Sequence, residues 1–214
     1  MRDELDSRGF KKLAHWGRGV DTDCFRPLGK SFLNLPRPIA AYVGRIAVEK
    51  NVRAFLAMPW KGSKIIIGDG PDRSHLMQAN PGVRFFGFLF GEDLARHLSG
   101  ADVFVFPSRT DSFGLVMLEA MACGVPVAAF PVTGPIDVVT EGVNGALDAD
   151  LHAAALRALK VSPTACREHA LRWSWEVCTR EFEANLVHCG AFESSPDAAS
   201  HALLSPPDDS RHRC

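Results

Sequence analysis

Short apolar runs alternate with helical patterns from residue 39 to residue 148. Each run is continuous, rich in β-branched or aromatic residues, and bounded by Gly or Pro, which is the pattern of strands buried on both faces. The predicted strands cover residues 39–43, 64–67, 83–86, 102–106, 125–130 and 145–147. Helices are predicted between them at residues 51–57, 72–79, 92–99 and 115–123. This alternation indicates an α/β fold, a Rossmann-like doubly wound parallel sheet with helices on both faces.

The two flanks of this core have different patterns. Residues 1–38 are mixed and rich in turn-forming residues, and we interpret them as a lead-in or linker. Residues 149–193 show Ala, Leu and Arg at helical spacing, which predicts the final helices of the same domain. Four of their apolar residues form a stripe that needs a partner surface: Trp175, Val177, Phe182 and Leu186. Residues 194–214 have the composition of a disordered tail.

Composition and charge narrow the class of protein. The chain has 24 Lys and Arg against 25 Asp and Glu, so nothing indicates binding to nucleic acid by phosphate neutralisation. No apolar run reaches the roughly 18–20 residues of a membrane helix, and the polar start is unlike a signal peptide. The six cysteines form no CxxC pair and no histidine stands at zinc-ligand spacing. We therefore expect free thiols, a cytoplasmic protein and no metal site.

Two unusual loops follow the first and fourth predicted strands. In a sheet of order 3-2-1-4-5-6 these loops flank the crevice where a ligand binds. The first loop contains Gly44, Arg45 and, five residues further, Lys50; the second is residues 108–114, which run into the helix at residues 115–123. Two cations facing a helix N-terminus predict a diphosphate site. Solvated surface cations remain the alternative interpretation.

Two acidic residues lie close to this crevice in the sequence. Glu119 is the one polar side chain in the apolar helix at residues 115–123, where a carboxylate is costly unless it has a partner. It is either paired with a core arginine or placed at the sheet edge, or it accepts hydrogen bonds from ligand hydroxyls such as those of a ribose. Asp111 stands just before the same helix, so capping alone would explain it.

The sequence at residues 108–127, Ser-Arg-Thr-Asp-Ser-Phe-Gly-Leu-Val-Met-Leu-Glu-Ala-Met-Ala-Cys-Gly-Val-Pro-Val, closely resembles the signature of the family 4 retaining glycosyltransferases. That family has the two-domain GT-B fold, and two acidic residues of its signature flank seven others; here the pair is Asp111 and Glu119. Gly44-Arg45 with Glu49-Lys50 is similar to the family's Gly-Arg…Glu-Lys segment. The resemblance is strongest to a bacterial branch that uses a GDP- or UDP-sugar, with an α-mannosyltransferase as the nearest type.

The resemblance implies a role for each matching residue. Arg45 and Lys50 would neutralise the leaving diphosphate, Asp111 would bind sugar hydroxyls, and Glu119 would bind the ribose; the first three are the expected catalytic residues. The base is expected beside the turn that contains Phe88. The donor-binding residues implied in full are Gly44, Arg45, Lys50, Gly87, Phe88, Asp111, Phe113, Gly114, Leu115, Val116 and Glu119. No metal and no cofactor beyond the nucleoside-diphosphate sugar is implied.

The resemblance covers one half of the family's architecture. Members have an N-terminal domain that binds the acceptor, and nothing before residue 39 has a pattern that could form it. We therefore expect the donor half alone, with residues 39–148 binding the nucleotide sugar. The expected partners are the donor, a lipid or glycan acceptor and a separate acceptor-domain chain, in the cytoplasm or at the inner face of the membrane. A non-catalytic nucleotide-sugar-binding fragment, and an epimerase or phosphorylase of similar fold, are the alternatives.

Overall fold

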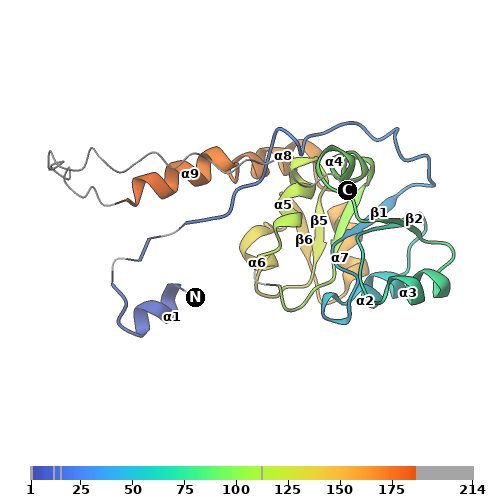
Figure 1. Ribbon diagram of the computed structural model, residues 1–214, viewed down its shortest axis with the longest axis horizontal. Coiled ribbons are helices and arrows are strands. Elements are labelled where there is room, and N and C mark those ends of the chain that lie inside the picture. The colour runs from blue at the N-terminus through green and yellow to red at the C-terminus, as the bar shows by residue number, and fades with distance from the viewer. Residues whose placement is uncertain (1, 12, 15, 112, 187–214) are drawn as a thin grey trace, which may run out of the picture.

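The computed structural model describes residues 2–11, 13–14, 16–111 and 113–186. Its centre is a six-stranded sheet of order β3-β2-β1-β4-β5-β6 (Figure 1). Every neighbouring pair of strands is parallel. The strands are β1 (Ile39–Val43), β2 (Ser63–Ile67), β3 (Arg84–Gly87), β4 (Val103–Phe106), β5 (Val127–Ala129) and β6 (Gly145–Leu147). The predicted fold class and strand order are confirmed.

Alternate residues of the strands enter two separate hydrophobic cores, one on each face of the sheet, except in the edge strand β3, where only Phe85 packs against a core. In β4, Phe104 and Phe106 lie in one core, while Val103 and Val105 lie in the other. The first core is covered by α4 (Gly91–Gly100), α5 (Leu115–Ala122), α6 (Pro135–Val138) and α8 (Pro163–Leu171). The second is covered by α2 (Val52–Ala57), α3 (Arg73–Ala79) and α7 (Leu151–Ala158). Because both faces are covered, the strands read as continuous apolar runs.

Strand β5 is shorter than the sequence pattern predicts, and two short helical turns were not predicted. Residue Val125 belongs to the turn that ends α5, where its backbone N–H donates to Ala120, so β5 starts only at Val127. The turn Val48–Lys50 forms a short 3₁₀ helix, η1, before α2. Helix α6 was not predicted, because a single turn of four residues has too little periodicity to be recognised.

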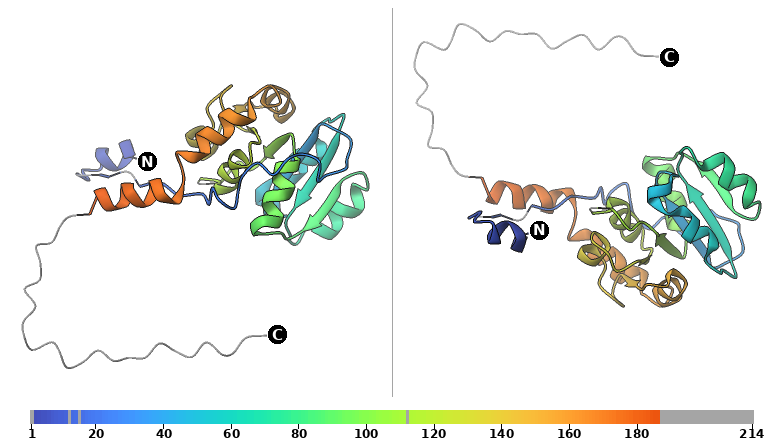
Figure 2. Two further views of the ribbon diagram at one scale, coloured as in Figure 1. Left: turned by 90° about the horizontal axis from the view of Figure 1, so that it is seen from above. Right: turned by 90° about the horizontal axis from the view of Figure 1, so that it is seen from below.

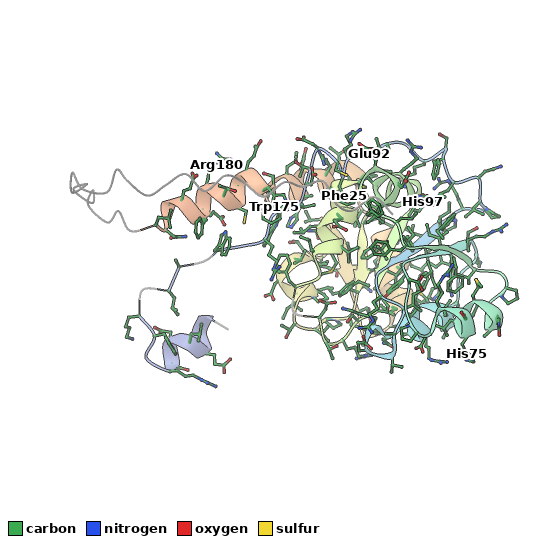
Figure 3. The ribbon with its side chains drawn as sticks, in the orientation of Figure 1. Phe25, His75, Glu92, His97, Trp175 and Arg180 are labelled. Atoms are coloured by element: carbon green, nitrogen blue, oxygen red, sulfur yellow. The ribbon has the colours of Figure 1, made fainter. Side chains whose placement is uncertain are left out.

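The segment expected to be a lead-in contributes to the domain. Val20, Phe25 and Leu33 are buried in the first core, where they pack beside α4 and α5 (Phe25 is labelled in Figure 3). The guanidinium of Arg167 on α8 donates to the carbonyls of Thr22 and Phe25 at 2.9 and 2.7 Å. Residues 20–38 are therefore part of the folded unit and not a free linker. A short helix, α1 (Arg2–Ser7), precedes them.

Helix α9 (Trp175–Ala184) projects from the body of the domain, as both views of Figure 2 show. The segment from Trp16 to Val20 lies beside it: Cys178 Sγ is 3.1 Å from the carbonyl of Gly17, and the rings of Trp16 and Phe182 are 5.0 Å apart. Trp175, Phe182 and Leu186 still expose 53%, 43% and 56% of their surface. The predicted apolar stripe is thus largely uncovered. The predicted tail, residues 194–214, lies outside the described residues.

Candidate donor-binding site

A cavity of about 210 Å³ opens at the carboxyl ends of β1 and β4, the point at which the strand order reverses. It is lined by Tyr42, Val43, Gly44, Arg45, Lys50, Phe106, Ser108, Asp111, Val116 and Glu119. Six of these residues were expected in the site from the sequence: Gly44, Arg45, Lys50, Asp111, Val116 and Glu119. The two loops and one face of α5 therefore converge as the parallel topology requires.

The loop after β1 is shaped by Tyr42, the single tyrosine of the chain. Its buried hydroxyl donates to the carbonyl of Arg45 at 2.8 Å, and burial raises the pKa of Tyr42, so the hydroxyl stays protonated. Gly44 has φ +149°, and a Cβ at this position would lie 3.0 Å from the Tyr42 hydroxyl oxygen. The sequence pattern gave no reason to select Tyr42, because it lies inside an apolar strand.

The two predicted cations have different surroundings. Lys50 Nζ contacts Asp111 Oδ2 at 2.5 Å across the crevice, and the Lys50 side chain is 31% exposed. Arg45 is 67% exposed and its guanidinium lies 3.8 Å from Glu49 of the same loop. Lys50 is therefore held inside the site, whereas Arg45 is at its mouth. Exposed ion pairs such as Arg45–Glu49 contribute little to stability and are easily exchanged for a ligand.

Asp111 does not cap α5. The residue at the N-cap position is Gly114, with φ +75°, and no side chain of the described residues caps the first turn. The capping explanation of Asp111 is therefore wrong, because its carboxylate faces Lys50 instead. Ser112, a residue type that also caps helices and that stands before α5 in the sequence, lies outside the described residues. The first backbone N–H groups of α5, at Leu115 and Val116, have no partner within the helix.

Glu119 is the most perturbed acidic group of the site. Burial raises the pKa of its carboxyl to about 7. Among the described residues, no cation and no hydrogen-bond donor contacts this carboxylate, so the interpretation as a core ion pair is wrong. Ser108 Oγ, in the same cavity, is fully buried and has no hydrogen-bond partner within the described part of the chain. Ser108 lines the cavity but was not among the residues expected in the site from the sequence.

Gly87 and Phe88 lie outside this cavity. Gly87 is the last residue of β3 and Phe88 follows it, two strands away from β1 but at the same edge of the sheet. Phe88 is 72% exposed, and its ring stands 6.1 Å from the ring of Phe90. Phe113 and Leu115, also expected in the site, are half-buried against the first core, and the Phe113 ring lies 5.6 Å from that of Trp173.

The described residues contain no group of three His, Cys, Asp or Glu that could hold a metal ion. Four cysteines can be described, and all four are free thiols: Cys24, Cys123, Cys166 and Cys178. None of the helices in the described residues has the length and apolar character that a membrane span requires.

Comparison with known proteins gives the family. The profile described as "Glycosyl transferases group 1" matches residues 37–161, more than half of the chain. This chain belongs to the group 1 glycosyltransferases. A GDP-mannose-dependent alpha-mannosyltransferase of Corynebacterium glutamicum is 37% identical over 155 residues, which cover 68% of this chain and 37% of that protein. A D-inositol 3-phosphate glycosyltransferase of Mycobacterium marinum is 36% identical over 199 residues, covering 75% of this chain and 42% of the relative.

The fold agrees with this assignment. The lipopolysaccharide outer core galactosyltransferase WaaB superposes with a TM-score of 0.70 at 18% identity, covering 86% of this chain and 58% of WaaB. The chain is thus the C-terminal domain of a GT-B glycosyltransferase. It spans less than half the length of the two curated relatives.

Proposed function

We propose that this domain binds the nucleoside-diphosphate sugar of a retaining glycosyltransferase that transfers a hexosyl group, most simply mannosyl from GDP-mannose. The observation that carries the proposal is the cavity at the switch point, where Lys50 and Asp111 face the unpartnered Glu119 and Ser108. The GDP-mannose dependence of the 37% identical relative supports the choice of donor. A UDP-linked donor is the alternative.

Each group has a part in the proposed reaction. The bond between the sugar anomeric carbon and the diphosphate oxygen breaks, and negative charge grows on that oxygen. Lys50, with Arg45 recruited from the mouth of the cavity, would stabilise this charge, together with the N–H groups of Leu115 and Val116. The acceptor hydroxyl oxygen then bonds to the anomeric carbon, and its proton passes to the departing diphosphate oxygen.

The remaining groups would orient the donor. The Glu119 carboxylate would accept from the two ribose hydroxyls, with Ser108 Oγ beside it. Asp111 would accept from hydroxyls of the sugar once Lys50 turns to the phosphates. The base would lie at the β3 end of the same sheet edge, where Phe88 offers an exposed ring for stacking. Retention of configuration would require the acceptor to arrive on the face of the sugar that the diphosphate leaves.

A second function is favoured by one observation. On the apolar stripe of α9, Trp175, Phe182 and Leu186 expose 53%, 43% and 56% of their surface. The chain would then bind nucleotide sugar without turnover until an acceptor-binding partner covers the stripe. Such a partner could be a separate chain.

Calorimetry tests both functions. The full chain is titrated with GDP, UDP, ADP and GDP-mannose, and release of GDP from GDP-mannose is followed in parallel. Binding of GDP in preference to UDP and ADP supports the proposed donor, and tight UDP binding instead would replace it. Binding without GDP release, also when a lipid or glycan acceptor is added, favours the non-catalytic function. Absence of binding to all four ligands would refute both.

A further inference from the structure

Asn51 has a backbone conformation that no other non-glycine residue of the described chain adopts. Its φ is 53° and its ψ 35°, the left-handed region, at the junction between η1 and α2. Asparagine tolerates this region better than other side chains, but glycine adopts it at no steric cost. The backbone alone therefore does not account for an amide side chain at this position. The side chain also makes no capping bond to α2.

The Asn51 side chain instead reaches the other loop of the crevice. Its Nδ2 donates to the carbonyl of Pro107 at 3.1 Å, across a sequence separation of 56 residues. Pro107 is the first residue after β4, directly before Ser108. The neighbouring residue, Lys50, contacts Asp111 of the same loop. Two adjacent residues thus tie η1 to the loop after β4: Asn51 by a hydrogen bond from its side-chain amide, and Lys50 by an ion pair.

The two ties respond differently to a ligand. The Lys50–Asp111 contact joins two groups that a donor would engage, so it breaks or rearranges when phosphate and sugar enter. The Asn51–Pro107 hydrogen bond joins a side-chain amide to a backbone carbonyl, and neither of these residues lines the cavity. It can persist while Lys50 changes partner. A lysine side chain is long and flexible, so its aim depends on where its backbone is fixed.

We propose that Asn51 is a positioning residue for the donor diphosphate, because its hydrogen bond to Pro107 holds the backbone of Lys50 against the cavity. The proposal rests on the proposed function of Lys50. What the proposal adds is that the tie between η1 and the loop after β4 holds the Lys50 ammonium group in place before the ligand binds.

The test replaces Asn51 by glycine, which keeps the left-handed backbone and removes only the amide. The matched control is Asn80→Gly, which removes a hydrogen bond of the same type, from Asn80 Nδ2 to the carbonyl of Leu76 at 2.8 Å, at the end of α3. Calorimetry with GDP and with guanosine, and amide hydrogen exchange, are measured on the full chain of all three proteins. Lys50→Ala is measured alongside them.

Asn51→Gly is expected to weaken GDP binding by about three- to tenfold, the effect of one ordinary hydrogen bond, and to leave guanosine binding unchanged. Amide exchange is expected to accelerate at residues 48–51 and also at residues 108–111. Asn80→Gly should change neither the ratio of the affinities for GDP and guanosine nor the amide exchange at residues 48–51 and 108–111. A merely structural role would move the affinities for GDP and guanosine together.

Several results would overturn the proposal. Unchanged GDP affinity in Asn51→Gly, while Lys50→Ala loses it, refutes the positioning role and leaves the proposed function intact. Equal loss of GDP and guanosine binding also refutes it. If the unaltered chain binds neither ligand, the proposed function fails by itself. Amide exchange of Asn51→Gly then tests the structural part of the proposal. Faster exchange at residues 48–51 and at residues 108–111 supports the tie between η1 and the loop after β4, and faster exchange at residues 48–51 alone refutes it.

Discussion

Lys50 Nζ lies 2.5 Å from Asp111 Oδ2, so the residue expected to bind phosphate is paired with the residue expected to bind sugar. The pair neutralises both charges across the crevice while no donor is present. A diphosphate must therefore compete with Asp111 for Lys50. This competition gives the two residues effects of opposite sign on the binding of GDP, which carries no sugar.

Asp111→Asn should bind GDP as tightly as the unaltered chain or more tightly, because the ammonium group of Lys50 loses its competing carboxylate. The same variant should lose the additional affinity for GDP-mannose over GDP, since the amide is a weaker acceptor for sugar hydroxyls. Calorimetry with both ligands measures this ratio. A parallel loss of affinity for GDP and GDP-mannose would show that Asp111 only supports the loop.

Lys50→Ala should weaken GDP binding by about tenfold or more, because charge-assisted contacts to phosphate are worth roughly 1.5–3 kcal/mol. Guanosine binding should hardly change. Lys61→Ala is the matched control, since Lys61 is exposed and forms no ion pair or side-chain hydrogen bond within the described residues. Equal weakening of GDP and guanosine would place Lys50 outside the phosphate site.

Glu119 should make both stability and donor binding depend on pH near neutrality. Its folded pKa of about 7 lies above the usual value of 4.5, so the folded state binds the extra proton and loses stability as the pH rises from about 4.5 to 7. Glu119→Gln removes this dependence. It should gain on the order of 2–3 kcal/mol relative to the unaltered chain between pH 5 and pH 8 in denaturant unfolding.

Titration of Glu119 should change donor affinity with pH in the direction opposite to its effect on stability. An ionised carboxylate is the better acceptor for ribose hydroxyls, so affinity for GDP-mannose should rise with pH through about 7. GDP-mannose is suited to the measurement because its diphosphate diester has no titrating group in that range. Glu119→Gln should have a flat pH profile. The same slope in both proteins would assign the titration to another group.

Gly114→Ala should destabilise the domain by about 1–3 kcal/mol, because φ is +75° and the new Cβ would lie 2.8 Å from Met117 Cε. Gly82→Ala is the control, since a Cβ at Gly82 meets no atom within 4 Å and its φ is not in the left-handed region. Thermal unfolding compares the two variants. Equal melting temperatures would show that the first turn of α5 adapts freely.

The uncovered stripe on α9 should cause self-association that increases with concentration, because large exposed apolar patches are uncommon on monomers. Light scattering over a wide concentration range measures this. Leu186→Glu should reduce it, whereas Leu171→Glu, at an exposed leucine of α8, should not. A monomer at all concentrations, with α9 resistant to protease, would mean that the stripe needs no partner.

The sheet could be predicted from the sequence because its strands are buried on both faces. In β4 all four residues are buried, so the apolar run ends where the strand ends, and the loop that lines the cavity follows it. The positions of Arg45, Lys50 and Glu119 followed from this topology. The resemblance of residues 108–127 to a known signature was equally local, and the family assignment agrees with it.

Features that depend on distant contacts could not be predicted. Val20 and Phe25 are single apolar residues in a polar stretch, and nothing local shows that α8 and α5 will cover them. The pairing of Lys50 with Asp111 spans 61 residues and depends on the η1 turn. Tyr42 looked like an ordinary strand residue, because its role comes from a hydroxyl that returns to its own loop.

The segment beside α9 runs in the reverse order to the helix. The contacts that join them include Trp16 with Phe182, Gly17 with Cys178, Gly19 with Trp175, and Val20 with Ser174. Tension applied between Trp16 and the C-terminal end of α9 would open these contacts one after another, starting with the contact between Trp16 and Phe182. The sheet would carry none of this load until the last contact had opened. We therefore expect the contacts between α9 and the segment from Trp16 to Val20 to open at a lower force than the sheet. Force spectroscopy should record a first extension at low force before the sheet unfolds.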